Sequence, residues 1–299
     1  MGVNIKKFEC IHHGDDQLGE GPVWNDQDQS LYWVDCVGKK ISATRLDNSP
    51  ARTWALPDMP GSYAFRENGG LVMAFRRGLA YVELNESGVD TEWIPNTGVD
   101  PKIVRFNDGA CDRRGRFWTG TFHNKITEPL GGLFRLDGDL SVHSMDSGIM
   151  MSNGMAWSPD NRTMYYTDSR PGYVFAYEFD LEDGTVRNRR IFLDYSKEPH
   201  SADGCTVDTL GCLWVAEVGA GRIARYTPAG KLDSVYDLPV SRPSSVAFAG
   251  AQLNLLCVTT LRFGLTEEEK AREPLAGALF ALSPGVSGLP EPRFRVVPQ

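Results

Sequence analysis

The chain has 299 residues, of which 41% are hydrophobic and 23% are charged, and its formal net charge at pH 7 is −8. This composition is typical of a globular protein with a large core and excludes a disordered or fibrous chain. The acidic balance, with no dense run of Lys and Arg, argues against a nucleic-acid partner, because phosphate binding needs clustered cations.

The sequence shows no export or membrane signal. The first residues, Met1 to Lys7, have no apolar run behind their two lysines, as a signal peptide would have. No window approaches the roughly 20 apolar residues of a membrane helix. The six cysteines are scattered without a CxxC pair, which is typical of reduced thiols that pack as small hydrophobic side chains. We therefore expect a cytoplasmic protein that does not act at membranes.

One hydrophobic pattern recurs along the chain. Each copy follows a polar or glycine turn and is rich in aromatic and β-branched residues, which is the composition of a buried strand. The copies occupy residues 31–35, 71–74, 116–120, 163–168, 212–217 and 253–259. Their starts are 40 to 49 residues apart, which is the length of one four-stranded propeller blade.

A further strand follows in most copies. Alternating segments bounded by turn residues occur at 40–46, 132–136, 173–178, 222–226 and 278–282. Only residues 266–272 have a helical pattern, with Thr266 and Glu269 at capping-box spacing and Pro274 behind them. An α/β barrel needs eight helices and is therefore excluded.

The sequence thus predicts an all-β protein, a six-bladed β-propeller with four-stranded antiparallel blades around a central channel. The length alone would suit two domains, but the regular repeat predicts a single domain over residues 1–299. We expect residues 5–11 and 294–297 to be partners that close the ring, because an open ring leaves exposed strand edges.

Four polar residues stand at the same place in four of the six copies. They lie 9 to 11 residues before their aromatic runs and are Glu20, Asn107, Asn153 and Asp203. The remaining two copies have, at the comparable positions, Gly61 or Ser62, and Ser244. Since the first strand of each blade lines the channel, the four polar side chains are expected to converge at one channel mouth.

Such a cluster of oxygen ligands suits a hard divalent cation, namely Ca²⁺, Mg²⁺ or Mn²⁺, with Zn²⁺ tolerated. One Asn-Gly or Asp-Gly pair is by itself only a turn signal. Glu20 is not a turn former, however, and four residues in phase favour a site. A glycine follows each within two residues, and we interpret it as allowing the backbone to approach a ligand.

The motifs occur in a recognisable order: LGEGP at residues 18–22, RFNDG at 105–109, SNG at 152–154 and PLAGALF at 274–280. With these motifs the chain resembles the gluconolactonase family, which includes regucalcin (senescence marker protein), bacterial sugar lactonases and luciferin-regenerating enzyme. The resemblance covers essentially the whole chain. It implies a six-bladed propeller with one divalent metal ion, Ca²⁺, Zn²⁺, Mn²⁺ or Mg²⁺, at the channel mouth.

The resemblance also implies roles for single residues. Glu20, Asn153 and Asp203 match the family's metal ligands. Arg105 and Asn107 match its substrate-contacting pair.

A position that is acidic in regucalcin and contacts the sugar falls at Lys125 here. We expect Lys125 to contact the substrate, and this departure leaves the identity of the lactone open.

The implied reaction is hydrolysis of a sugar lactone such as gluconolactone to the sugar acid, which makes the protein a carboxylic ester hydrolase. The metal ion would polarise the lactone carbonyl and activate water. Asp203 is the predicted general base, and His200, three residues earlier, is its rival.

Two other functions compete with this hypothesis. One is another metal-dependent propeller hydrolase, phosphotriesterase-like or a different esterase, and the other is a non-enzymatic calcium-binding regulatory protein. A pure calcium binder would have no use for Arg105 beside the metal. The expected partner is a small sugar lactone, with the chain acting as a monomer or a small homo-oligomer.

Overall fold

A computed structural model describes residues 7–47 and 49–297. The strands of these residues form six four-stranded antiparallel sheets, and helix is confined to one short segment, α1 (Glu267–Arg272). The predicted six-bladed β-propeller is therefore confirmed. The chain divides into two compact units, which are residues 1–53 with 197–290 (the first unit) and 54–196 with 291–299 (the second unit). A single domain over residues 1–299 stays a prediction.

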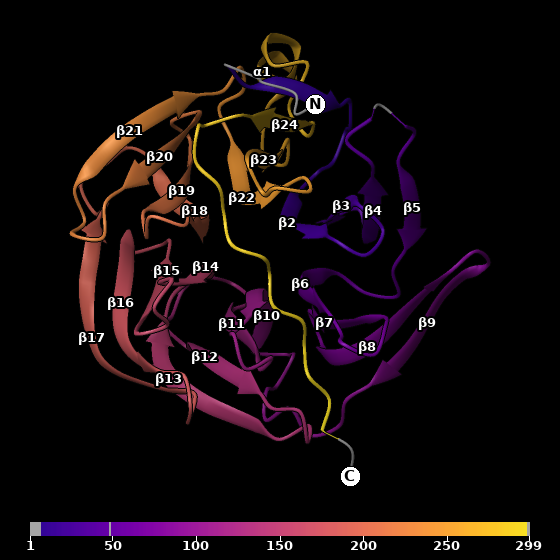
Figure 1. Cartoon of the computed structure of the whole chain (residues 1–299), viewed down its shortest axis with the longest axis vertical. Helices are drawn as coiled ribbons and strands as arrows, with labels where there is room; N and C mark the ends of the chain where they lie inside the picture. The colour runs from indigo at the N-terminus through magenta and orange to yellow at the C-terminus, as the bar shows by residue number, and fades with distance from the viewer. Residues whose placement is uncertain (1–6, 48, 298–299) are drawn as a thin grey trace. The chain divides into compact units, whose positions relative to one another are not determined.

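Three of the six sheets consist of strands from the first unit, apart from the end of β5, which lies in the second unit (Figure 1). Their strands, in sheet order, are β2 (Gly19–Asn25), β3 (Ser30–Asp35), β4 (Lys40–Thr44) and β5 (Arg52–Ala55); β18 (Ser201–Val207), β19 (Leu213–Val218), β20 (Arg222–Tyr226) and β21 (Leu232–Asp237); and β22 (Pro243–Ala249), β23 (Leu255–Thr260), β24 (Leu279–Leu282) and β1 (Glu9–His12).

The other three sheets belong to the second unit. Their strands are β6 (Pro60–Phe65), β7 (Leu71–Phe75), β8 (Gly78–Asn85) and β9 (Gly88–Trp93); β10 (Val104–Cys111), β11 (Phe117–His123), β12 (Gly131–Leu136) and β13 (Val142–Ile149); and β14 (Ser152–Trp157), β15 (Thr163–Asp168), β16 (Tyr173–Asp180) and β17 (Thr185–Asp194).

The six hydrophobic runs are strands, as predicted, and the structure places them as the second strands of the six sheets. These strands are buried on both faces, because each lies between two hydrogen-bonded strands and has packed side chains above and below it. That is why they read as continuous hydrophobic runs. The fourth strands β9, β17 and β21 are instead largely exposed.

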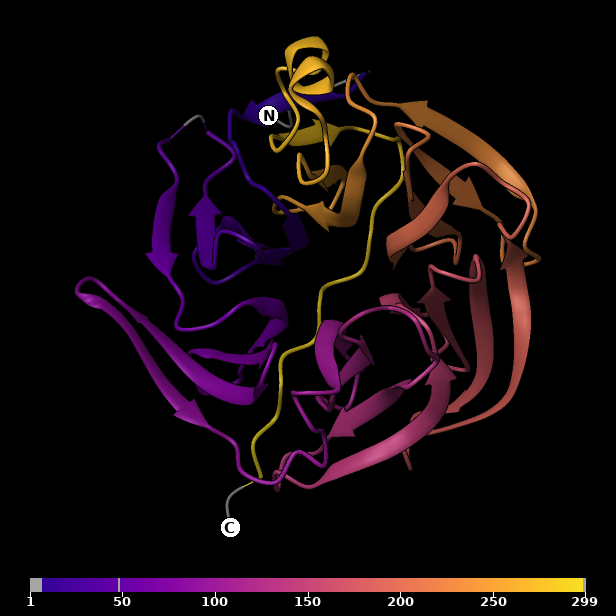
Figure 2. The same ribbon diagram turned by 180° about the vertical axis from the view of Figure 1, so that it is seen from behind.

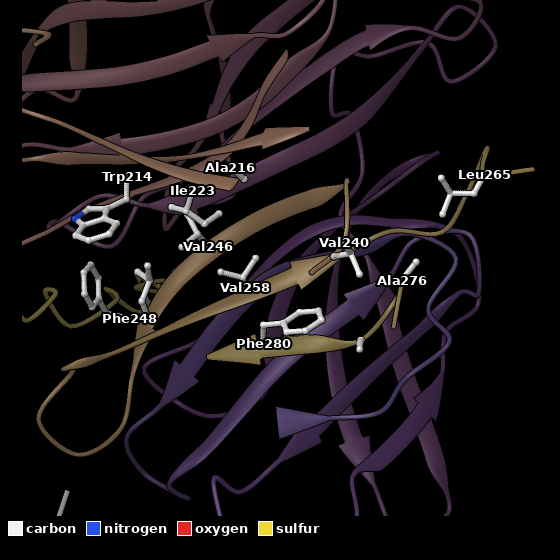
Figure 3. Packing of buried hydrophobic residues seen from close by; sticks show 12 residues of the cluster. Trp214, Ala216, Ile223, Val240, Val246, Phe248, Val258, Leu265, Ala276 and Phe280 are labelled. Carbon is white, nitrogen blue, oxygen red and sulfur yellow. The ribbon is translucent and has the colours of Figure 1, made fainter. Parts of the chain in front are cut away.

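Side chains of the second strands fill the space between neighbouring sheets. In the first unit, the Trp214 ring meets Phe248 edge to face at 5.8 Å between centroids and stacks with Tyr236 at 5.3 Å. Figure 3 shows Trp214, Phe248, Val258 and Phe280 in one such layer. Complete burial of a phenylalanine of this kind contributes about 1.5–3 kcal/mol.

Buried aspartates tie two of the tryptophans to their sheets. Asp208 accepts hydrogen bonds from Trp214 Nε1 at 2.9 Å and from Arg225 Nε at 2.9 Å. Asp112 repeats the arrangement in the second unit, accepting from Trp118 Nε1 at 2.8 Å and Arg116 Nε at 2.6 Å. Each aspartate lies five residues after a predicted site position, so the anchor follows the repeat.

The chain ends depart in part from the prediction. Glu9–His12 supplies the fourth strand of the sixth sheet, paired with β24, whereas residues 5 and 6 of the predicted segment lie outside the described residues. Phe294 does not join it. Its side chain is fully buried in the second unit, where its backbone bonds Phe65 and Glu67. The expected pairing of residues 294–297 is wrong because β1 already occupies the open side of β24.

The C-terminal segment crosses the turns of the second unit, as Figure 2 shows from the opposite side. Arg295 N donates to Gly115 O at 2.9 Å, and Val297 N donates to Gly138 O at 2.9 Å. Within the described residues, no helix is long and apolar enough to cross a membrane. No disulfide joins the six cysteines, all of which are described.

The buried aspartate anchor leads to a stability prediction. Asp208→Ala should lower the free energy of unfolding by about 3 kcal/mol, since it leaves the Arg225 guanidinium and the Trp214 indole without their buried acceptor. Urea denaturation followed by tryptophan fluorescence measures this. Asp233→Asn, which removes only the exposed partner of Arg225, is the control and should keep the wild-type midpoint. Equal midpoints for both variants would contradict the anchor.

Candidate functional site

Two of the predicted site residues lie in the first unit. Glu20 is the second residue of β2 and Asp203 the third of β18. Both strands contact β22, the first strand of the third sheet of this unit. The contact is close, because Ser244 Oγ donates to the carbonyl of Gly19, the residue before Glu20. The two carboxylates therefore stand on first strands that flank β22.

The glycines that follow the predicted site residues are required by the backbone conformation and by the packing of strands. Gly21 has φ +53°, a conformation that other residues adopt only with strain. A Cβ on Gly204 would lie 2.3 Å from Ser245 Oγ, and one on Gly109 would lie 2.5 Å from the carbonyl of Trp118. The structure thus explains Gly21 by the bulge in β2, and Gly204 and Gly109 by the close packing of strands, whereas the sequence interpretation invoked the approach of a ligand.

The structure joins two further site residues in the second unit. Asn107, on β10, donates from Nδ2 to Asn153 Oδ1 at 2.7 Å and to the carbonyl of Ser152 at 2.7 Å. Asn153, the second residue of β14, donates from its own Nδ2 to Ser169 Oγ at 2.7 Å. These bonds fix which end of each amide is the oxygen.

The orientation of the two side-chain amides determines which atoms of Asn107 and Asn153 can still bind a ligand. Asn153 presents Oδ1 on the side of Asn107, where the second lone pair can bind a cation. Both hydrogens of Asn107 Nδ2 are already used, so any further polar contact of this side chain is made by Oδ1 as an acceptor.

Arg105 lies two residues before Asn107 on the same strand. Its guanidinium carbon is 4.4 Å from the centroid of the Phe122 ring, and Nη1 is 3.4 Å from Met59 Sδ. The aromatic face thus packs against the planar cation and orients it. Lys125 is exposed in the turn between β11 and β12.

Asp108 follows Asn107, and the pKa of its carboxyl is shifted from the usual value for aspartate. Burial raises the pKa of its carboxyl to about 6, and the hydrogen bond from Gly109 N at 2.8 Å opposes this only in part. The residue as a whole is partly accessible to solvent.

His200 is neither an exposed loop residue nor free to act as a simple base. Its side chain is 8% exposed, and Nε2 lies 3.3 Å from Oε2 of the fully buried Glu217. Glu217 also accepts from Tyr226 OH at 2.9 Å and from Arg222 Nε. This network gives His200 a structural partner.

The donor chemistry of Glu20, Asn153 and Asp203 fits a hard divalent cation. Two carboxylates and an amide whose oxygen is oriented by Ser169 supply oxygen ligands alone. Between residues 7 and 297, Asn48 excepted, no three His, Cys, Asp or Glu side chains gather into a metal-binding group. The expected ligand set contains two residues of these types and one asparagine.

Sequence reasoning gave no role to four buried or perturbed acids. Asp108 stands inside the RFNDG motif, and Asp35, Asp168 and Glu217 close three of the aromatic runs. The signal was a carboxylate at the end of a hydrophobic strand, but its contacts are made with residues distant in the sequence.

Comparison with known proteins places the chain in a family. Residues 18–262 match the region described as SMP-30/Gluconolactonase/LRE-like. The chain therefore belongs to the SMP-30/gluconolactonase/LRE-like family.

Its relatives match over nearly their whole length. The chain is 33% identical to a 6-deoxy-6-sulfogluconolactonase of Pseudomonas putida over 288 residues, which are 96% of this chain and 98% of the relative. It is 35% identical to regucalcin of Gallus gallus, covering 95% and 97% of the two chains. The solved structure of a calcium-binding regucalcin from Agrobacterium tumefaciens matches with a TM-score of 0.91 at 23% identity, over 98% of this chain and 100% of its own, and shows the fold.

The raised pKa of Asp108 leads to a prediction for metal-free protein. Because the folded state holds this proton more tightly than the unfolded state, ionisation destabilises the fold, and the stabilising protonated form is lost as the pH rises through about 6. Relative to Asp108→Asn, the wild type should therefore lose thermal stability between about pH 4 and pH 7. Melting temperatures of both proteins across this range measure the effect. All other titrating groups are shared, so a constant difference would contradict it.

Proposed function

We propose that this protein hydrolyses a sugar lactone to the open sugar acid, using one divalent cation held by Glu20, Asn153 and Asp203. The observation that carries the proposal is membership of the SMP-30/gluconolactonase/LRE-like family over residues 18–262, with all three expected ligands present. The relative from Pseudomonas putida, named 6-deoxy-6-sulfogluconolactonase, supports a lactone as the substrate class.

In this proposal the residues divide the chemistry among them. A bound divalent cation supplies Lewis acidity, which polarises an ester carbonyl and lowers the pKa of water. Asp203 accepts a proton from the attacking water and returns it to the ring oxygen as the C–O bond of the lactone breaks. The product is the hydroxy acid, so water is the only co-reactant. His200 is less suited to this step, since Nε2 already faces Glu217.

The substrate is oriented by the second unit's residues. Arg105 donates from its guanidinium to ring or hydroxyl oxygens while stacked on Phe122. Asn107 contributes only Oδ1 and therefore accepts from a sugar hydroxyl. Lys125 adds a cation in an exposed turn, which favours a lactone carrying an anionic substituent over a neutral one.

The decisive experiment is pH-stat hydrolysis of a lactone panel. Gluconolactone, galactonolactone, xylonolactone and 6-deoxy-6-sulfogluconolactone are assayed with EDTA and then with added Ca²⁺, Mn²⁺ or Zn²⁺. We expect turnover of at least one lactone that falls to background with EDTA and returns with metal. Hydrolysis of a phosphotriester alone, or stoichiometric calcium binding without any turnover, would refute the proposal in favour of another hydrolase or a regulatory calcium binder.

The ligand assignment is tested separately by metal content. Glu20→Gln and Asp203→Ala should each abolish stoichiometric metal, because each removes a carboxylate ligand, while the melting temperature of the metal-free protein stays near that of the wild type. Elemental analysis after dialysis measures the metal. Glu198→Gln makes the same charge change as Glu20→Gln at an exposed position five residues before Asp203 and should leave the metal content unchanged. Full metal occupancy in both ligand variants would refute the assignment.

A further inference from the structure

In each sheet that carries a proposed metal ligand, an acidic residue of the second strand pairs with the residue just before that ligand. In every sheet, the residue one or two positions before the site residue pairs with one near the end of the second strand. In three sheets that partner is acidic, and the pairs are Gly19 with Asp35, Ser152 with Asp168, and Ala202 with Glu217. In the other three sheets the partners are Phe75, Thr121 and Thr260. The acids thus stand in the three sheets that carry Glu20, Asn153 and Asp203.

Asp35 holds the turn that leads into Glu20. The carboxylate is 2% exposed and accepts hydrogen bonds from the backbone of Gln17 and Leu18, both at 3.0 Å. These residues lie three and two positions before Glu20. Lys40 Nζ, 3.7 Å away, balances the buried charge.

Asp168 makes the same contacts in the second unit. Its carboxylate, 3% exposed, accepts from the backbone of Met150 at 3.1 Å and of Met151 at 2.8 Å. These residues again lie three and two positions before the site residue, Asn153. The neighbouring Ser169 N donates to the carbonyl of Met151 at 3.0 Å, and Ser169 Oγ accepts from Asn153 itself.

Glu217 acts on the equivalent turn through a side chain. It is one methylene longer than aspartate, is fully buried, and contacts Nε2 of His200 at 3.3 Å. His200 lies three positions before Asp203, the offset of Gln17 and Met150 in the other two sheets. Arg222 and Tyr226 hold the remaining sides of the carboxylate.

The first strands need such a restraint because their ladders are interrupted beside each proposed ligand. The register shifts between Glu20 and Val23, between Asn153 and Met155, and between Ala202 and Cys205. A bulge of this kind leaves the residue without regular pairing on its C-terminal side. The direction of each ligand is therefore set from the preceding turn, where the acids act.

We propose that Asp35, Asp168 and Glu217 are positioning residues, which fix the entry turns of β2, β14 and β18 and thereby set the affinity for the divalent cation. The proposal rests on the proposed function, in that Glu20, Asn153 and Asp203 bind the ion. Partners that orient metal ligands typically change metal affinity by about 10- to 100-fold when they are replaced.

The test is calorimetric titration of metal-free full-length protein with CaCl₂, MnCl₂ and ZnCl₂. Asp35→Asn, Asp168→Asn and Glu217→Gln keep the size of each side chain but introduce an NH₂ group that opposes the donors. We expect each to weaken binding of the ion by about 10- to 100-fold, with the melting temperature of the metal-free protein recorded alongside. Three variants in different sheets keep the test decisive if one of them fails to fold.

Thr260→Val is the matched control. Thr260 occupies the same register position in a sheet without a proposed ligand, and its hydroxyl bonds Ala278 O at 2.7 Å and Gly277 N at 3.0 Å. It should lower the melting temperature while leaving the metal affinity within about twofold of wild type. Unchanged affinity in the acid variants, with wild type binding metal, would overturn the positioning role but leave the proposed function standing. A wild type that binds none of the three ions would overturn both.

Discussion

Hydrogen bonds between neighbouring first strands are the constraint from which the candidate site follows. The site residue of one sheet donates to a backbone carbonyl of the next, as Asn107 does to Ser152 and Ser244 does to Gly19. Ser62 similarly donates to the carbonyl of Asn107. Because these bonds require the backbones to lie close together, glycine or serine fills the adjoining positions. The same contacts that pack neighbouring sheets also align their polar side chains. The residue at the site position of the repeat therefore contributes both to packing and to the polar cluster.

Buried carboxylates perform two different tasks in the sheets that carry them. Asp112 and Asp208 lie five residues beyond a site position and each bind an indole and a guanidinium. Asp208 thereby ties the second strand of its sheet to the third, whereas the guanidinium bound by Asp112 belongs to Arg116, just before the second strand. Asp35 and Asp168 lie at the other end of the second strand and bind backbone amides of the turn before the site. Each charge is compensated by several donors, as burial demands. Part of the net charge of −8 is therefore structural.

The site residues themselves carry few such restraints from their own ladders. A bulge follows Glu20 and Asn153, and Asp203 lies within one. The shifted backbone pairing at these points changes the direction of the neighbouring side chains, as a bulge does. Contacts outside the ladder hold this region instead. Buried acids bind the turns before Glu20 and Asn153, and the Asn153 amide donates to Ser169. The neighbours of the proposed ligands are thus held by residues outside the proposed ligand set.

The sequence by itself determined the repeat, the second strands, most of the third strands, the capped helix at Glu267–Arg272 and the positions of the polar residues. Each of these depends on hydrophobic contrast or on local spacing, which a single strand or turn carries within itself. The exposed fourth strands, such as β9 and β21, lack that contrast. Residues 294–297 were assigned the wrong partner because β1 takes the open side of β24, a pairing between distant parts of the chain. Only the tertiary structure decided how the Asn107 and Asn153 amides are turned, why the pKa of Asp108 is raised, and what His200 contacts. Those properties depend on atoms that come from other strands, and no local pattern records them.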